Sequence, residues 1–356
     1  MNNPIKKSKT ILLVFFSILL VVFLTGEIGL RLKGFKMMRL TTQPRSLLTA
    51  DSVSGWKLTE GTYTICFNDS NSFFVATVNQ KGDRITSMNA QSYDTGKVTT
   101  IQIYGCSCTF RFSVPDSSTQ SFILQSKLPN CRIQNKGVPR YGLAQMFLHL
   151  QQVVSSGDTP QVAVFNYANF QERRTALSAE WGSVISLLVE AEPSDKKGAN
   201  KSGRLTLPYY DIKQDSLWLH YSDFSDLEHL CPLVNYSSLL LLSNIQYVQY
   251  KDQEKTNAFH ETATKTAFEI MKYCKSHRIT PIFASLTESE DSSQIDDISL
   301  KLKQSGYLTL NYGITFDDNR YNKPLSRDKS HPNSTAHAVY ADKLYAYLME
   351  KKLILK

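Results

Sequence analysis

The chain has 356 residues, of which 42% are hydrophobic, so it is long enough to bury the core of one large or two modest domains. Its net charge of +8 could indicate a nucleic-acid partner, but much of the excess lies around one apolar run near the N-terminus. The basic residues there are Lys6, Lys7, Lys9, Arg31, Lys33, Lys36 and Arg39. The remainder is close to neutral, which argues against nucleic-acid binding.

The apolar run covers residues 10–30, and its charge-free part extends from Thr10 to Gly26. That length is at the lower limit for a helix that crosses a membrane. A cleaved signal peptide is the alternative, but the run is long for one and no A-x-A-like cleavage site follows it. We therefore predict a single-pass anchor over 10–30 that places a cytoplasmic tail (1–9) inside and the rest in the periplasm or outside the cell.

The segment 40–99 contains short strand-like runs, at 62–67 and 72–78, separated by turns rich in Asn, Asp and Gly. This pattern predicts a small β-rich module. From residue 100 the chain alternates buried-strand runs with amphipathic helical spacing. Strands are expected at 100–104, 131–135, 161–167, 280–286 and 307–312, and helices at 118–128, 142–154, 258–278, 294–305 and 334–349. Such alternation predicts an α/β domain over 100–356 with a doubly wound parallel sheet.

The stretch IQIYGCSCTFRF (101–112) places Ser107 directly after a strand and a glycine. A sharp turn from strand to helix is how α/β enzymes present a nucleophile, because the following backbone N–H groups can hold an oxyanion. The motif is not G-x-S-x-G, so an ordinary strand-ending loop stays open. Cys106 and Cys108 flank Ser107, but two residues apart on a strand they point the same way, which suits a metal site poorly. Cys108 remains an alternative nucleophile.

The stretch RDKSHPNSTAH (327–337) places Asp328 three residues before His331, at the start of the last helix. This spacing lets a carboxylate reach Nδ1 of the histidine and leaves Nε2 free to act as a base. His337 is expected on the surface of that helix. His149, His220, His229 and His260 have no partner by spacing.

Four segments in order resemble the SGNH (GDSL-type) hydrolases, in particular their membrane-anchored bacterial members. The segments are GCSCTF (105–110), NKGVPRYG (135–142), FNYANF (165–170) and DKSHPN (328–333). The resemblance covers residues 100–350. It implies a flavodoxin-like sheet between two layers of helices, an ester substrate and no cofactor or metal.

Carried over to this sequence, the resemblance makes Ser107 the nucleophile, His331 the base and Asp328 the residue that orients it. The oxyanion hole would consist of the N–H groups of Ser107 and Gly137 and the side chain of Asn169. Asn166 is the other asparagine in that segment and is expected to be a strand-end polar residue.

The sequence departs from the family pattern at four positions: Cys106 for Asp, Arg111 and Arg140 for Gly, and Phe170 for Asp. Three functions therefore stay open. The chain is a serine ester hydrolase of the cell envelope, an O-acyltransferase that modifies an envelope glycan with the same triad, or a catalytically silent binding protein with this fold. Its partners would be a small-molecule or glycan ester and, through the N-terminal helix, the membrane.

Overall fold

The computed structural model describes residues 4–35, 40–67, 73–88, 98–112, 114–179, 181, 206–223, 236–286, 296–314, 318–321 and 331–354. Its centre is a five-stranded parallel sheet in the order β12-β11-β8-β6-β7. The strands are β6 (Thr99–Gly105), β7 (Cys131–Gly137), β8 (Val162–Tyr167), β11 (Thr280–Ser285) and β12 (Leu308–Asn311). Numbered along the chain this order is 2-1-3-4-5, the flavodoxin-like order, so the predicted fold class is confirmed.

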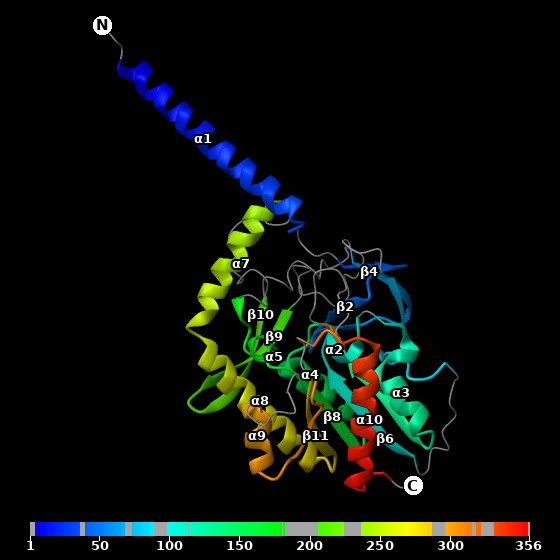
Figure 1. Ribbon diagram of the computed structural model, residues 1–356. Coiled ribbons are helices and arrows are strands. Elements are labelled where there is room, and N and C mark those ends of the chain that lie inside the picture. Colours follow the sequence, from blue (N-terminus) through cyan, green and yellow to red (C-terminus); the bar gives the residue numbers. More distant parts are fainter. Residues whose placement is uncertain are drawn as a thin grey trace.

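Helices cover both faces of the sheet because its strands are apolar on both sides. In β8, Ala163 and Phe165 face one hydrophobic cluster, while Val162 and Val164 face the other. The first cluster is completed by α4 (Leu143–Ser155), α8 (Thr256–Ser276) and α9 (Asp297–Gln304), and the second by α3 (Gln120–Lys127) and α10 (Ser334–Glu350). The result is a sheet between two layers of helices (Figure 1).

The N-terminal segment forms two small antiparallel sheets, as the β-rich pattern predicts. Their strands are β1 (Leu40–Gln43), β4 (Gly61–Phe67) and β5 (Phe73–Val78) in one, and β2 (Leu48–Asp51) and β3 (Gly55–Leu58) in the other. Arg84 forms isolated bridges with both Val78 and Asn135, and so connects β5 to the edge strand β7. The side chain of Trp56 is fully buried and donates from Nε1 to the carbonyl of Pro139 at 3.0 Å, so this module shares the core of the larger domain.

A hairpin of two strands and a helix were not expected from the sequence. The region around His220 forms a hairpin of β9 (Thr206–Lys213) and β10 (Ser216–Asp223), and α7 (Ser238–Gln253) precedes α8. The hairpin packs on the domain through Leu207 and Tyr210. Short helices η1 (Asp116–Ser118) and α5 (Gln171–Thr175) follow β6 and β8.

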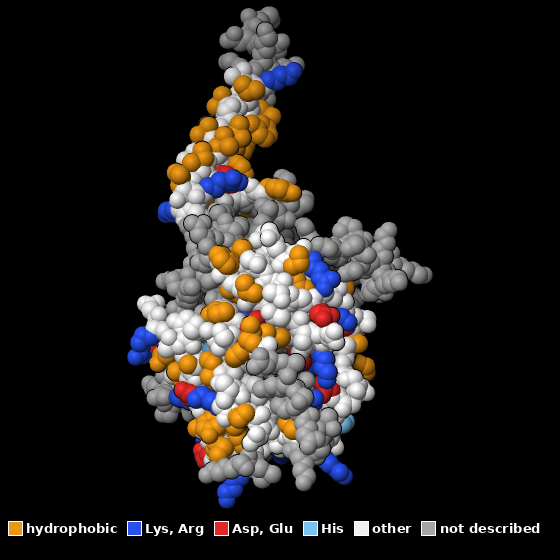
Figure 2. All heavy atoms as spheres, turned by 90° about the vertical axis from the view of Figure 1, so that its right-hand side faces the viewer, with side chains coloured by type: hydrophobic (Ala, Val, Ile, Leu, Met, Phe, Trp, Pro, Cys, Tyr) orange, Lys and Arg blue, Asp and Glu red, His pale blue; other side chains and the backbone are white. Residues whose placement is uncertain are grey.

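The first helix, α1 (Pro4–Leu32), projects from the rest of the molecule (Figure 1). Its segment Lys9–Leu32 contains an 18-residue window with a mean hydropathy of 2.7 and is long and apolar enough to cross a membrane, a test that a signal sequence near an N-terminus also passes. Apolar side chains cover this projecting helix, as Figure 2 shows.

The last turns of α1 contact the start of α7. The carboxylate of Glu27 accepts hydrogen bonds from the backbone N–H groups of Ser238 and Leu239, both at 3.0 Å, and from the hydroxyl of Ser237 at 2.9 Å. Arg31 donates to Glu27 and to the carbonyl of Tyr236. A carboxylate at the beginning of a helix satisfies N–H groups that have no partner within the helix, so this contact stabilises α7.

Candidate active site

The site lies at the carboxyl end of β6, where the chain turns into the short helix α2 (Ser107–Phe110). Gly105 ends the strand beside Gly137, and a Cβ atom at Gly105 would lie 2.0 Å from Oγ1 of Thr109. Only a glycine leaves room for α2 to fold back so closely on the strand. This turn points the Ser107 side chain at the segment that precedes α10.

The structure brings Ser107 and His331 together, 224 residues apart in the chain. The Oγ atom of Ser107 and Nε2 of His331 are 3.0 Å apart, within hydrogen-bonding distance. The Phe112 ring lies 5.8 Å from the His331 ring, centroid to centroid. Ser107 is 6% exposed, so the pair is largely shielded from water but still reachable.

His331 is positioned by the residues that begin α10. Asn333 caps the helix, since its side chain accepts from the N–H of Ala336 at 3.1 Å. The N–H of Asn333 donates to the carbonyl of Tyr321, and its side-chain amide donates to the carbonyl of Arg320. These bonds hold the turn that carries His331 against the segment 318–321. Asp328, predicted to orient His331, lies outside the described residues.

The predicted oxyanion-hole residues lie on neighbouring elements. The backbone of Ser107 begins α2, and Gly137 ends the adjacent strand β7. The N–H of Gly137 donates to Oδ1 of Asn135 at 3.0 Å, so its use by a substrate would require exchange of that bond. Asn169 is exposed in the turn after β8 and lines a pocket there. Their roles in an oxyanion hole stay predictions.

Asn166 is fully buried below α2. Its amide nitrogen donates to Oγ1 of Thr109 at 3.1 Å and to Oε1 of Gln120 at 2.9 Å, and its oxygen accepts from the Tyr312 hydroxyl at 3.1 Å. All its hydrogen-bonding groups are thus used within the protein. Asn166 supports the helix that carries Ser107, which agrees with its interpretation as a strand-end polar residue.

A second group of buried polar residues supports α2 from the side of the N-terminal module. Arg84 donates to the carbonyls of Phe110, Arg111 and Val114, and its Nε lies 2.7 Å from Asp116. Neither side chain of this ion pair is exposed by more than 8%. Local spacing provides no signal for Arg84, because its partners lie 26 to 32 residues away along the chain.

Two of the four departures from the family pattern lie in left-handed backbone. Arg111 has φ 81° and Arg140 has φ 72°, conformations that glycine adopts more readily. The Arg111 side chain is buried and donates from Nη1 to the carbonyl of Ser118 at 2.5 Å. Cys106 and Cys108 are both buried, and neither forms a disulfide with another described cysteine. Burial opposes ionisation of Cys106, but its hydrogen bonds with Cys108 and the charge of Arg174 outweigh that effect and lower its pKa.

His337 was expected on the surface, and this prediction is wrong. Its ring is fully buried against Tyr340, and its Nδ1 accepts from the backbone N–H of Gln120 at 3.1 Å. His260, expected to have no partner, bridges two carboxylates: its Nδ1 lies 3.0 Å from Glu172 and its Nε2 2.8 Å from Asp297. Spacing along the helix could not show either contact, since every partner comes from another element.

No protein-family model matches the chain, and no curated protein matches it. Solved structures do. A putative lipolytic protein of the G-D-S-L family from Desulfitobacterium hafniense is 10% identical with a TM-score of 0.36, over 70% of this chain and 98% of that one. A putative acylhydrolase from Bacteroides fragilis is 13% identical with a TM-score of 0.38, over 74% and 92%.

A third similar structure is the esterase EstA from a Pseudoalteromonas species, inhibited by monoethylphosphonate. It is 9% identical with a TM-score of 0.39, over 71% of this chain and 98% of the esterase. These are similarities of chain arrangement.

Proposed function

We propose that the chain is a serine ester hydrolase held at the cell envelope by its N-terminal helix. The observation that carries this proposal is the contact of 3.0 Å between Oγ of Ser107 and Nε2 of His331 at the carboxyl end of β6. A serine hydroxyl is a weak nucleophile at neutral pH, and an adjacent imidazole that accepts its proton activates it. In open α/β sheets this edge is also where ligands bind.

In the proposed mechanism, His331 takes the proton of Ser107 as Oγ attacks the ester carbonyl. The N–H groups of Ser107 and Gly137 and the side chain of Asn169 stabilise the oxyanion, and loss of one such donor typically lowers the rate by about 100-fold or more. His331 then gives the proton to the leaving alcohol. Water, activated by His331, releases the acid from the acyl-enzyme. Asp328 is proposed to hold His331 in the tautomer with a proton on Nδ1.

The contact between α1 and α7 supports the assignment of the first helix as a retained anchor. A signal peptide is removed, and cleavage after the apolar run would take Glu27 away from Ser237, Ser238 and Leu239. The start of α7 would then lose a partner for two backbone N–H groups. Retention of α1 therefore fits the way in which the globular part is built.

The test is turnover of p-nitrophenyl acetate by the detergent-solubilised full chain and its Ser107→Ala, His331→Ala and Cys108→Ala variants. Ser107→Ala and His331→Ala are expected to lose at least about 1,000-fold in kcat, because the nucleophile and its base act as a unit. Cys108→Ala is expected to retain turnover.

Loss of turnover in Cys108→Ala alone would identify the thiol as the nucleophile. If the folded wild-type chain shows no turnover, even when glycan acceptors are added, the result would favour a catalytically silent binding protein. If the ester is consumed faster in the presence of a glycan acceptor than in water alone, the chain would be identified as an acyltransferase that uses the same residues.

A further inference from the structure

A pocket of about 470 Å³ lies beside the proposed oxyanion residue Asn169. Its walls come from the loop after β7, from the turn and short helix after β8, and from the start of α8. The strands β7 and β8 are the two neighbours of β6, which carries Ser107. The pocket is thus built on the same sheet edge as the Ser107–His331 pair, and Asn169 is the proposed site residue that lines it.

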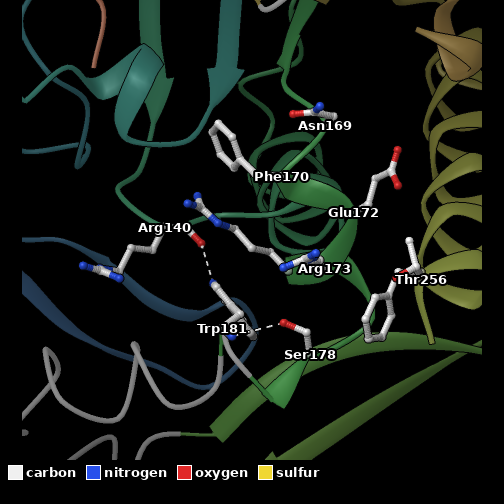
Figure 3. A pocket seen from close by; sticks show the side chains of 10 residues that line it. Arg140, Asn169, Phe170, Glu172, Arg173, Ser178, Trp181 and Thr256 are labelled. Carbon is white, nitrogen blue, oxygen red and sulfur yellow. Dashed lines mark hydrogen bonds between the residues drawn. The ribbon is translucent and has the colours of Figure 1, made fainter. Parts of the chain in front are cut away.

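Positive charge dominates this pocket. Its described lining residues include three arginines, Arg140, Arg173 and Arg174, and one carboxylate, Glu172. Glu172 already accepts from the Tyr167 hydroxyl at 2.8 Å and contacts Nδ1 of His260 at 3.0 Å. Figure 3 shows Glu172 and Arg140 pointing to opposite sides, with Arg173 between them. Among the described lining residues, arginines therefore outnumber carboxylates by three to one.

The pocket also holds its arginines in a fixed arrangement. The guanidinium of Arg174 lies over the Phe170 ring, 4.5 Å from its centroid, and such stacking orients a planar cation. The backbone is tight here as well, since a Cβ atom at Gly142 would lie 2.7 Å from Cβ of Arg174. The charge of Arg174 also lowers the pKa of Cys106, the residue before Ser107 in the chain.

Aromatic side chains form the remaining walls. Phe170, Trp181 and Phe259 line the pocket, and Nε1 of Trp181 donates to the carbonyl of Arg140 at 3.3 Å, which fixes the indole ring. Aromatic faces beside a few oriented polar groups are typical of sites for small molecules with both apolar and polar surface. Guanidinium groups match carboxylate and phosphate because they donate two parallel hydrogen bonds.

We propose that this arginine pocket binds a carboxylate or phosphate group of the substrate, so that the enzyme prefers anionic esters to neutral esters of the same size. The proposal rests on the proposed ester hydrolysis and adds to it a class of substrate. Arg173 and Arg174 contact the anion, Phe170 and Trp181 contact the body of the substrate, and the ester lies at Ser107.

The experiment compares three acetate esters with the detergent-solubilised full chain. They are an O-acetylated methyl glucuronide, the methyl ester of that compound, and an O-acetylated methyl glucoside 6-phosphate. Released acetate is measured for each. The first two differ in one group, which is an anionic carboxylate in the first and its neutral methyl ester in the second, and the third distinguishes phosphate from carboxylate as the preferred anion. Wild type is expected to have a kcat/KM for at least one anionic ester about tenfold or more above that for the neutral one.

The variants Arg173→Gln and Arg174→Gln are expected to bring this ratio close to one. The matched control is Arg278→Gln. Arg278 is an exposed arginine with φ 59°, and it lies just before β11, at the opposite edge of the sheet. Its replacement is expected to keep the ratio of the two kcat/KM values. A wild-type ratio near one for both anions, or a ratio that persists in both pocket variants, would overturn the inference.

A binding measurement separates this inference from the proposed hydrolysis. Glucuronate and inorganic phosphate are titrated into the Ser107→Ala chain by calorimetry, with and without Arg173→Gln or Arg174→Gln. Binding that either pocket substitution weakens about tenfold supports the arginine pocket even if Ser107 proves not to be the nucleophile. Absence of binding of both anions overturns the arginine pocket even if Ser107→Ala abolishes ester hydrolysis.

Discussion

His337 shows how one buried side chain couples stability to pH. Its Nδ1 accepts from Gln120, and burial together with the charges of Arg111, Arg84 and His331 lowers its pKa well below the ordinary value of 6.5. The folded protein therefore holds the ring neutral at a pH where the unfolded chain binds a proton. Because the unfolded chain binds this proton below pH 6.5 and the folded protein does not, the free energy of unfolding decreases as the pH falls below 6.5.

The variant His337→Gln is expected to unfold with a weaker dependence on acid. Between pH 6.5 and pH 5 the free energy of unfolding of wild type should fall more steeply, by about 1.4 kcal/mol per pH unit, because one proton is excluded on folding. Urea unfolding at a series of pH values measures this difference. His277→Gln, which alters an exposed histidine, is the control, and equal slopes in wild type and His337→Gln would contradict the assignment.

Several residues of the candidate site could be identified from the sequence because they belong to short motifs. Ser107 follows a strand and a glycine, and His331 precedes a helix start, so each had a local signal. The buried partners had none. Asn166 contacts Thr109 and Gln120 across 57 and 46 residues, and no spacing rule covers such distances. Polar residues that support a site from another element are found only when the chain is folded.

At the scale of elements, the helix α2 has a single turn and depends on its surroundings. A helix this short is not stable alone. Its carboxyl end is held by Arg84, which satisfies the carbonyls of Phe110 and Arg111. The position of Ser107 therefore depends on a residue of the N-terminal module.

The variant Arg84→Leu is expected to lose about 3–5 kcal/mol of stability and to lower turnover, because it leaves the Asp116 carboxylate buried without its cation. Lys81→Leu is the matched control: Lys81 pairs with Asp158 at 3.1 Å, but its side chain is 56% exposed, so its loss should cost less than about 1 kcal/mol. Denaturant unfolding and esterase assays measure both effects. The double variant Arg84→Leu/Asp116→Leu should recover part of the stability, and equal costs in the two single variants would contradict this role of Arg84.

The elements themselves were largely predictable. The bounds expected for the strands of the central sheet and for the helices of the α/β domain agree with the structure to within a few residues. Long apolar runs and helical spacing of apolar residues indicate which side chains are buried. The hairpin β9–β10 was missed since β9 contains Pro208, which is uncommon inside a strand, and no strong turn signal separates the two strands. The helix α7 was missed because its apolar residues do not gather on one face, and Glu27, far away in sequence, caps its start.

At the scale of the whole molecule, the contact between Glu27 and α7 makes the first helix part of the folded structure. The variant Glu27→Ala should raise hydrogen exchange at the N–H groups of Ser238 and Leu239 by about fivefold, the effect of losing a helix cap worth about 1 kcal/mol. Glu254→Ala, at the other end of α7, is the control and should leave these two amides unchanged.

The same preparation tests whether the helix is retained. Mass spectrometry of the chain purified from membranes should find residues 10–30 still attached. A mature N-terminus beyond Glu27, or unchanged exchange in Glu27→Ala, would show that the helix is not held in this way.

The packing of Trp56 has a consequence for the order in which the chain folds. Its indole contacts the carbonyl of Pro139 and lies 6.0 Å from the Trp181 ring, while its own carbonyl accepts from the Tyr141 hydroxyl. During synthesis, the strand that carries Trp56 is made about 80 to 120 residues before its partners Pro139, Tyr141 and Trp181. Until then the apolar face of that strand has nothing to bury it. Contacts of such long sequence separation slow folding and leave apolar surface exposed in the meantime, so we expect the nascent N-terminal module to be prone to aggregation until Trp181 has been synthesised.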